Sequence, residues 1–261
     1  MTDLSYLGIT EAASLFAAKK LSPVELCEAL LKRIEQLDPT YHAFITITPE
    51  TALGAARAAE EAFAAGETMS PMQGIPFGLK DIIDMAGVTT TCHSKLFAGR
   101  IAEANATVTA RLEDAGGVPM GKLATHEFAI GGPSFDLPWP PAVNPWGGAH
   151  FPGGSSSGSG VALASGMLPA ALGTDTGGSV RNPASMCAIV GMKATYGRVA
   201  RTGVFPLAFS LDHVGPMTRS VPDNAALLQV LAGYDPADPG SANVAVPDFS
   251  AELDLGIEGL K

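Results

Sequence analysis

The sequence predicts an α/β fold, in which short strands lie side by side and helices connect them. From Gly74 onward, short β-branched segments alternate with helix-like segments. The 261 residues are 46% apolar and only 16% charged, which is enough material for a large core. The 30 glycines and 20 prolines follow no three-residue period, so they indicate tight turns in a globular body and not a collagen-like repeat.

The first 68 residues are expected to form a helical arm. Thr10 is placed to cap the first helix. Ser22-Pro23-Val24-Glu25 is a capping box with proline at the first helical position, and the helix that follows carries one apolar stripe. The arm is predicted to contain helices over 10–20, 22–37 and 49–66 and a strand over 44–48.

The remaining elements are predicted within a core over 74–233. Asn105 is expected to cap a helix that Gly116 ends. The tryptophan- and proline-rich stretch 133–152 lacks too many backbone donors to be regular, and we predict a long surface loop there. The expected strands cover 75–83, 118–123 and 168–172, and the expected helices cover 106–115, 161–165 and 222–233, followed by a linker-like segment over 235–247.

Charge and cysteine content exclude several function classes. The 16 basic and 26 acidic side chains give a net charge of −10, which disfavours direct binding of nucleic acid or of an anionic membrane. The three cysteines are far apart and show no CxxC spacing, so neither a disulfide framework nor a zinc site is indicated, and a cytoplasmic location fits best. The five histidines are scattered and predict no metal site, and the sequence shows no export or membrane-spanning segment.

Three segments contain candidate reactive groups: 78–81, 153–160 and 173–181. Lys80 next to Asp81 is most often a solvated pair, and a Gly/Ser run is most often a linker. Gly154-Ser155-Ser156-Ser157-Gly158 fits the GxSxG nucleophile elbow with Ser156 as nucleophile, but the strand that should precede it is missing. Asp175-Thr176-Gly177 matches half of an aspartic-protease dyad, and no second copy occurs. No GxxxxGK[ST] phosphate loop is present.

Taken together, these segments resemble the amidase signature family. The resemblance rests on GIPFGLKDI around Lys80, GGSSSGSG around Ser155 and DTGGSVRNPAS around Ser179. It extends through 126–128, 144–146, 190–193 and 211–216, and so covers most of 74–233. Agreement at several separated motifs is much more specific than a match to any one of them.

The resemblance implies a role for each matching residue. Ser179 would be the nucleophile, Ser155 a bridging serine on a cis peptide, and Lys80 the terminal base, which must be uncharged to accept a proton. The oxyanion hole would be formed by Thr176, Gly177, Gly178 and Ser179, with Ser156, Asp175 and Arg181 in the supporting hydrogen-bond network. Cys187, between apolar neighbours, is expected to be a buried thiol with a raised pKa and not a competing nucleophile.

The resemblance also implies a fold and an activity. The fold would be a mixed, mostly parallel central sheet flanked by helices, and residues 1–261 would be one domain that lacks its C-terminal part. The activity would be hydrolysis of a small-molecule carboxamide to an acid and ammonia or an amine, without metal or organic cofactor, and formation of a homodimer stays open. Two alternatives also stay open: the glutaminase subunit of a tRNA-dependent amidotransferase, which works with partner subunits, and a catalytically inactive amidase-like scaffold.

Overall fold

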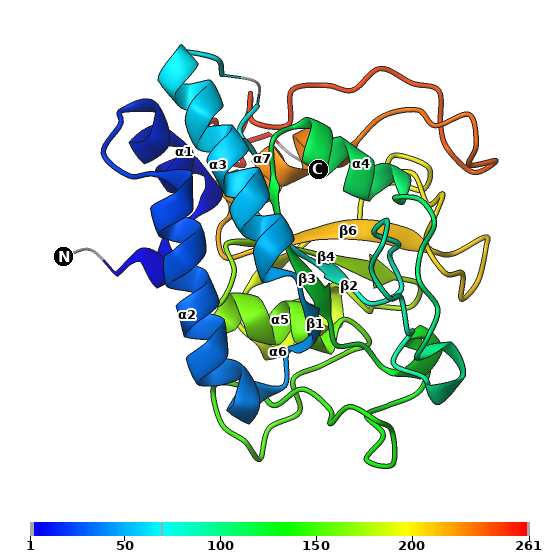
Figure 1. Cartoon of the computed structure of the whole chain (residues 1–261). Helices are drawn as coiled ribbons and strands as arrows, with labels where there is room; N and C mark the ends of the chain where they lie inside the picture. Colours follow the sequence, from blue (N-terminus) through cyan, green and yellow to red (C-terminus); the bar gives the residue numbers. More distant parts are fainter. Residues whose placement is uncertain (1–2, 69, 260–261) are drawn as a thin grey trace.

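The computed structural model describes residues 3–68 and 70–259, and a mixed six-stranded sheet lies at its centre (Figure 1). The strands are β1 (Phe44–Ile47), β2 (Pro76–Lys80), β3 (Val118–Leu123), β4 (Ala170–Asp175), β5 (Val190–Gly191) and β6 (His213–Thr218). Across the sheet their order is β1-β3-β2-β4-β6-β5. β2 pairs in parallel with β3 and β4, and the other pairings are antiparallel, so that β2, β3, β4 and β5 run in one direction. The expected mixed, mostly parallel sheet is therefore confirmed.

Helices cover the sheet on both sides. They are α1 (Ile9–Ala17), α2 (Pro23–Tyr41), α3 (Pro49–Ala65), α4 (Thr107–Asp114), α5 (Ser157–Ala164), α6 (Arg181–Met186) and α7 (Val221–Leu231), with single 3₁₀ turns at Leu4–Tyr6, Lys95–Phe97 and Glu127–Ala129. α5 contacts β2, β3, β4 and β6, while α7 contacts β5, β6 and α4. In Figure 1 the sheet lies between α5 and α6 on one side and α4 and α7 on the other. None of the described helices is long and apolar enough to cross a membrane.

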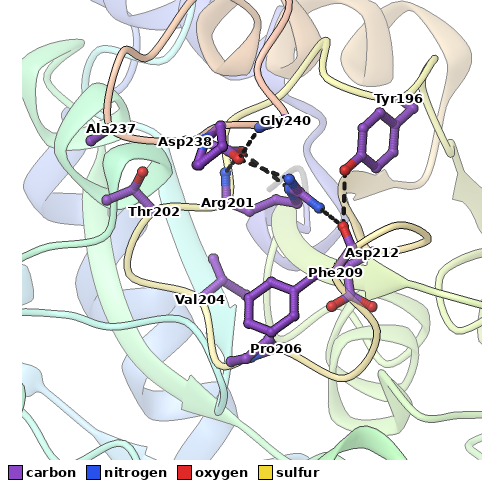
Figure 2. A pocket seen from close by; sticks show the side chains of 11 residues that line it. Tyr196, Arg201, Thr202, Val204, Pro206, Phe209, Asp212, Ala237, Asp238 and Gly240 are labelled. Carbon is purple, nitrogen blue, oxygen red and sulfur yellow. Dashed lines mark hydrogen bonds and ion pairs between the residues drawn. The ribbon is translucent and has the colours of Figure 1, made fainter.

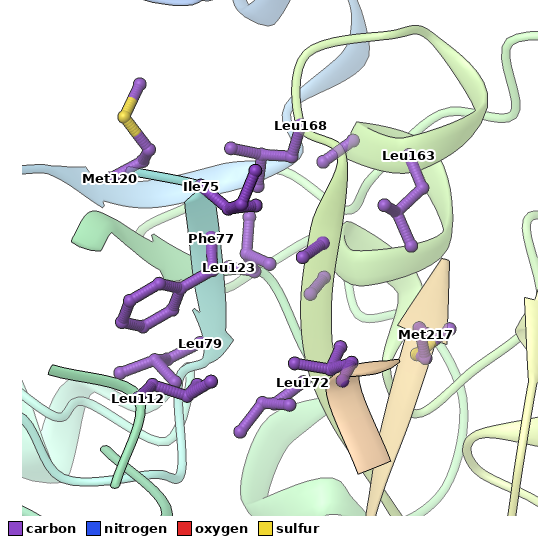
Figure 3. Packing of buried hydrophobic residues seen from close by; sticks show 14 of the residues in the cluster. Ile75, Phe77, Leu79, Leu112, Met120, Leu123, Leu163, Leu168, Leu172 and Met217 are labelled. Atoms are coloured by element: carbon purple, nitrogen blue, oxygen red, sulfur yellow. The ribbon is translucent and has the colours of Figure 1, made fainter. Parts of the chain in front are cut away.

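The core is built from the central strands. Every residue of β2, β3 and β4 is buried, as expected for parallel strands with helices on both faces. Figure 3 shows buried side chains of four adjacent strands, among them Phe77, Leu123, Leu172 and Met217, with Leu112 of α4 on the side of Phe77 and Leu163 of α5 on the side of Met217. Each such side chain contributes roughly 1.5–3 kcal/mol when fully buried. This packing fixes the ends of β2 and β4, where the candidate site lies.

The N-terminal helices follow the predicted signals, with two differences. The capping box at Ser22 and Glu25 is present, but α2 continues to Tyr41 because the Asp38 carboxylate caps the chain beyond it, accepting from the Ala43 N–H at 2.7 Å. Thr10 is not the cap of α1, which begins at Ile9. Its N–H and hydroxyl both donate to Asp223 Oδ1 at 2.9 Å, so that it joins α1 to α7. The division of the chain into an arm and a core stays a prediction.

The core elements also differ from the predictions at their ends. β3 and α3 have the expected bounds to within one residue, whereas β2 is shorter than predicted and ends at Lys80. Asn105 does not cap α4. Its side chain accepts from the Ala86 N–H at 2.7 Å and donates to Glu113 at 2.6 Å. The loop predicted over 133–152 has no helix or strand.

The Gly/Ser run is not a linker but the start of a helix. α5 begins at Ser157, inside this run and four residues before the prediction. A Cβ at Gly158 would collide with the backbone of Ala43 and Ala124, so only glycine allows this close approach of the helix to β3. The position of α5 therefore depends on long-range contacts and not on helix propensity.

Candidate active site

Three segments distant in the sequence meet at one edge of the sheet. β2 ends at Lys80 and its parallel neighbour β4 ends at Asp175, so that both carboxyl ends lie at this edge. Ser155 comes just before α5, which packs against both strands. Ser179 lies in the turn between β4 and α6. The fold thus brings together the residues that the sequence analysis singled out.

Lys80 and Ser155 are in direct contact. Lys80 is fully buried, and its Nζ lies 2.7 Å from Ser155 Oγ and 2.7 Å from Thr174 Oγ1. Ser155 is 3% exposed, and the Gly154–Ser155 peptide bond is cis. An amine hydrogen-bonded to two hydroxyls can donate to one of them and, when uncharged, accept from the other.

Burial accounts for the protonation state of this amine. Removal from water lowers the pKa of Lys80 from 10.5 to about 7, although the carboxylates of Asp175 and Asp212 act in the opposite direction. Lys80 forms no ion pair among residues 3–68 and 70–259. The Lys80 amine is therefore uncharged in a large fraction of the molecules at neutral pH. The solvated Lys80–Asp81 pair considered from the sequence is wrong.

Asp81 pairs instead with a second buried lysine. Lys122 Nζ lies 3.0 Å from Asp81 Oδ1 and donates to Thr90 Oγ1 at 2.8 Å. Both members of the pair are fully buried. Burial lowers the pKa of Lys122, and the neighbouring Asp81 carboxylate opposes this. Asp81 directly follows Lys80 in the chain, and its ion pair with Lys122 of β3 fixes the turn that follows β2.

Ser179 is linked to Ser155 through the backbone of Ser156. The Ser156 N–H donates to the Ser179 carbonyl at 3.3 Å. The Ser156 hydroxyl donates to the Thr174 carbonyl at 3.3 Å and accepts from the Thr174 N–H at 3.2 Å, and its side chain is fully buried. Within the described parts of the chain, the half-buried Ser179 hydroxyl has no hydrogen-bond partner. Ser156 is therefore a structural link, and the GxSxG interpretation with Ser156 as nucleophile is wrong.

Asp175 and Arg181 organise the turn that carries Ser179. Arg181 donates to the buried Asp175 carboxylate through Nε and Nη2, each at 2.9 Å, and the N–H groups of Gly178, Val180 and Arg181 also point to it. Burial raises the pKa of Asp175, but these hydrogen bonds outweigh burial and hold it below the ordinary value. This carboxylate is ion-paired with Arg181 and does not share a proton with a second carboxylate in the part of the chain that the structure describes, so the aspartic-protease interpretation is also wrong.

The turn over 176–179 offers backbone donors, with one correction to the expected set. The Gly178 N–H is not available to a bound oxyanion, because it donates to Asp175 Oδ1 at 2.8 Å. Gly178 has φ +129°, a conformation that favours glycine. In the described structure the N–H groups of Thr176, Gly177 and Ser179 have no partner, so three of the four expected donors stay available to an acceptor.

Two residues of the site were not identified from the sequence. Thr174 contacts Lys80, but the strand predicted over 168–172 stopped before it. Asp212 accepts from the Thr176 hydroxyl at 2.6 Å, and only its motif had been noted. The alternation of side chains along a longer β4 would have indicated Thr174. Asp212 is brought beside Thr176 by the pairing of β4 with β6, which the sequence did not predict.

A pocket of about 490 Å³ lies next to Asp212 (Figure 2). Val204, Pro206 and Phe209 form an apolar part of its lining. Its charged groups are already paired: Arg201 donates to Asp238 through Nη2 at 2.8 Å and through Nε at 3.1 Å. The Tyr196 hydroxyl donates to the Phe209 carbonyl at 2.9 Å. The pocket therefore offers mainly apolar surface to a bound molecule.

Metal-ligating and thiol groups play no visible part in this arrangement. Within residues 3–68 and 70–259, no cluster of three or more His, Cys, Asp or Glu side chains could hold a metal ion. Cys187 is fully buried, and burial raises the pKa of its thiol to about 12, as expected from its apolar neighbours. Its Sγ donates to the Pro152 carbonyl at 3.2 Å.

Comparisons with known proteins agree with this geometry. The Amidase family model matches residues 25–260. Over 261 residues the chain is 48% identical to a glutamyl-tRNA(Gln) amidotransferase subunit from Chloroflexus aggregans, a match that covers 100% of this chain and 54% of the relative. The chain thus spans about half the length of the curated relatives it matches.

Two solved structures have the same fold over nearly the whole chain. Peptide amidase from Stenotrophomonas maltophilia is 38% identical with a TM-score of 0.89, over 95% of this chain and 53% of that one. A chain of a vestigial protein complex, described as revealing the origins of an s-triazine catabolic enzyme, is 37% identical with a TM-score of 0.93, over 97% of this chain and 56% of that one.

Proposed function

The chain belongs to the amidase family, and on this basis we propose that it carries the nucleophile and the proton relay of an amidohydrolase. The reaction would cleave the C–N bond of a carboxamide and release an acid and ammonia or an amine. Ser179 is the proposed nucleophile, Ser155 the bridge and Lys80 the base. The finding that carries the proposal is the 2.7 Å contact between the Ser155 hydroxyl and a buried amine with a pKa of about 7.

In the acylation step, Ser179 Oγ attacks the amide carbonyl carbon. Its proton passes to Ser155, whose own proton passes to the uncharged Nζ of Lys80. The negative charge that develops on the carbonyl oxygen is stabilised by the N–H groups of Thr176, Gly177 and Ser179. When the C–N bond breaks, the ammonium of Lys80 returns a proton through Ser155 to the departing nitrogen, and an ester on Ser179 remains.

In the deacylation step, water attacks the ester carbonyl and loses a proton along the same relay to Lys80. The second tetrahedral intermediate collapses, the acid leaves, and the proton returns to Ser179 Oγ. Thr174 accepts an N–H of Lys80 throughout, which directs the lone pair of the uncharged amine toward Ser155. The enzyme is regenerated without any change in redox state.

Labelling with a fluorophosphonate tests the nucleophile. We expect one covalent adduct, which peptide mass spectrometry locates at Ser179, together with loss of amide hydrolysis. Ser179→Ala should abolish both, and Ser156→Ala should retain labelling because the Ser156 hydroxyl is buried in a hydrogen bond to Thr174. An adduct that persists in Ser179→Ala would contradict the assignment. A complete lack of labelling and turnover would favour the scaffold alternative.

The 48% identity to a glutamyl-tRNA(Gln) amidotransferase subunit supports a second candidate. In that case the amide is glutamine, and the released ammonia passes to a partner protein. Glutamine hydrolysis measured with and without the partner subunits of an amidotransferase separates the candidates. Turnover of simple amides without any partner supports the hydrolase, and glutaminase activity that strictly requires the partners supports the second candidate.

A further inference from the structure

Asp212 lies where the candidate site meets the pocket of Figure 2. It directly precedes β6, and the pairing of Asp175 with His213 places Asp212 next to Thr176, the first residue after β4. The Thr176 hydroxyl donates to Asp212 Oδ1 at 2.6 Å. Thr176 begins the segment that carries Gly177 and leads to Ser179, so this hydrogen bond helps to fix the position of the proposed oxyanion donors.

The same carboxylate holds the loop 204–212. The Leu207 N–H donates to Oδ2 at 2.9 Å, and the Ala208 N–H lies 2.9 Å from Oδ2 and 3.0 Å from Oδ1. The N–H groups of Leu211 and Asp212 donate in turn to the Ala208 carbonyl. Because hydrogen bonds to a charged acceptor are stronger than neutral ones, this loop is held firmly. Val204, Pro206 and Phe209 of the loop line the pocket (Figure 2).

We propose that Asp212 is a positioning residue that couples the pocket wall over 204–212 to the Thr176–Ser179 segment. It acts through Thr176 and not on a reacting atom, and this inference rests on the proposed function of that segment. A group bound in the pocket that moves the loop would thereby move the oxyanion donors. Substrates that fill the pocket with an apolar group would hold this arrangement in place.

The effect of the Asp212 charge on the pKa of Lys80 distinguishes the proposed role from a purely structural one. The carboxylate raises the pKa of Lys80, against the larger effect of burial. The other titratable groups near Lys80 are Asp175 on β4, Cys92 after β2 and His126 after β3. Because Asp212→Asn leaves all of these in place, it should lower the pKa of Lys80.

Two substitutions separate the charge from the hydrogen bond. Asp212→Asn removes the charge and keeps the shape, whereas Thr176→Val removes the hydroxyl and keeps the charge. We expect both to reduce kcat roughly ten- to a hundredfold, since each weakens a hydrogen bond to a charged group. In Asp212→Asn alone, the acid limb of kcat/KM should move to lower pH, on the order of half a pH unit. Asp38→Asn is the matched control, because the Asp38 carboxylate also accepts from two backbone N–H groups, those of Ala43 and Phe44, and these belong neither to the loop 204–212 nor to the Thr176–Ser179 segment.

Nuclear magnetic resonance makes the test independent of turnover. The ¹³Cε signal of Lys80, assigned through its loss in Lys80→Met, should titrate at lower pH in Asp212→Asn and at the wild-type pH in Thr176→Val. The amide signals of Gly177 and Ser179 should shift in both variants and not in Asp38→Asn. Unchanged amide signals or an unchanged Lys80 titration in Asp212→Asn would overturn the inference, whether or not the protein hydrolyses amides. Expected shifts in a protein without amide turnover would support the coupling and contradict only the proposed function.

Discussion

Replacing Lys80 with methionine should stabilise the folded protein at neutral pH while removing the proposed base. Folding buries Lys80 and lowers its pKa from 10.5 to about 7. Between these values the unfolded chain binds more protons than the folded one, so the wild-type free energy of unfolding must rise with pH across that window. The difference between 10.5 and about 7, at 1.36 kcal/mol per pH unit, amounts to about 5 kcal/mol, of which about 4 kcal/mol applies at pH 7.

Methionine removes this penalty but leaves two hydroxyls without their partner. Ser155 and Thr174 each lose a 2.7 Å hydrogen bond to Nζ, at a cost of about 1 kcal/mol apiece. The net gain for Lys80→Met at pH 7 is therefore about 2 kcal/mol, and it should vanish near pH 9 and become a net loss of about 1 kcal/mol at pH 10. Urea unfolding at pH 6 to 10 measures both the gain and its pH dependence.

The control for this experiment is Lys32→Met, in which an exposed lysine of α2 is replaced. Its ammonium is hydrated in both the folded and the unfolded chain, so this variant should follow the wild-type curve at every pH. If wild type and Lys80→Met show the same slope of stability against pH, the buried, partly uncharged amine on which the proposed chemistry depends does not exist.

Three further substitutions test neighbouring features. Thr174→Val should lower kcat roughly tenfold and move the acid limb of kcat/KM to lower pH, because the ammonium of Lys80 loses an acceptor; a profile identical to wild type would contradict the role of Thr174. Lys122→Met should destabilise the protein by about 3 kcal/mol in thermal unfolding, because the buried Asp81 carboxylate loses its ion-pair partner. Adding Asp81→Asn should restore most of this loss. No recovery in the double variant would argue against the ion pair. Gly178→Ala should cost about 1–2 kcal/mol through its φ of +129° and lower kcat more than KM; unchanged kcat would show that the turn tolerates a side chain.

Local signals in the sequence predicted local structure well. The capping box set the start of α2, and glycine set the end of α3, where Gly66 adopts the left-handed conformation. β3 matches its predicted range, and its start follows the turn signal of Gly116 and Gly117. These features depend on residues close together in the chain.

Features that depend on tertiary contacts were not predicted. α5 begins in a Gly/Ser run that resembles a turn, and its helical form follows from the close approach of Gly158 to β3. α6, β5 and β6 were missed, since α6 is short, β5 has two residues, and β6 contains Pro216. Because β6 was not predicted, the contact of Asp212 with Thr176 was not predicted either, since the pairing of β4 with β6 creates it.

The candidate site shows the same division. The resemblance assigned roles to Lys80, Ser155 and Ser179, and the structure places the first two in contact. The role of each backbone donor could not be predicted from the sequence, because the Gly178 N–H turns toward Asp175 only in the folded chain. Sequence motifs thus name candidate reactive groups, while the direction of each hydrogen bond comes from the fold.

The concentration of roles on β4 has an evolutionary consequence. This one strand holds the Lys80 amine through Thr174, fixes the turn that carries Ser179 through Asp175 and continues directly into that turn. Mutations in the strand would disturb all three at once, whereas the irregular loop over 133–152 and the pocket wall over 204–212 lie outside it. Exchange of these loops with Asp212 kept in place would therefore change substrate preference, while the proposed hydrolytic machinery is inherited as a unit.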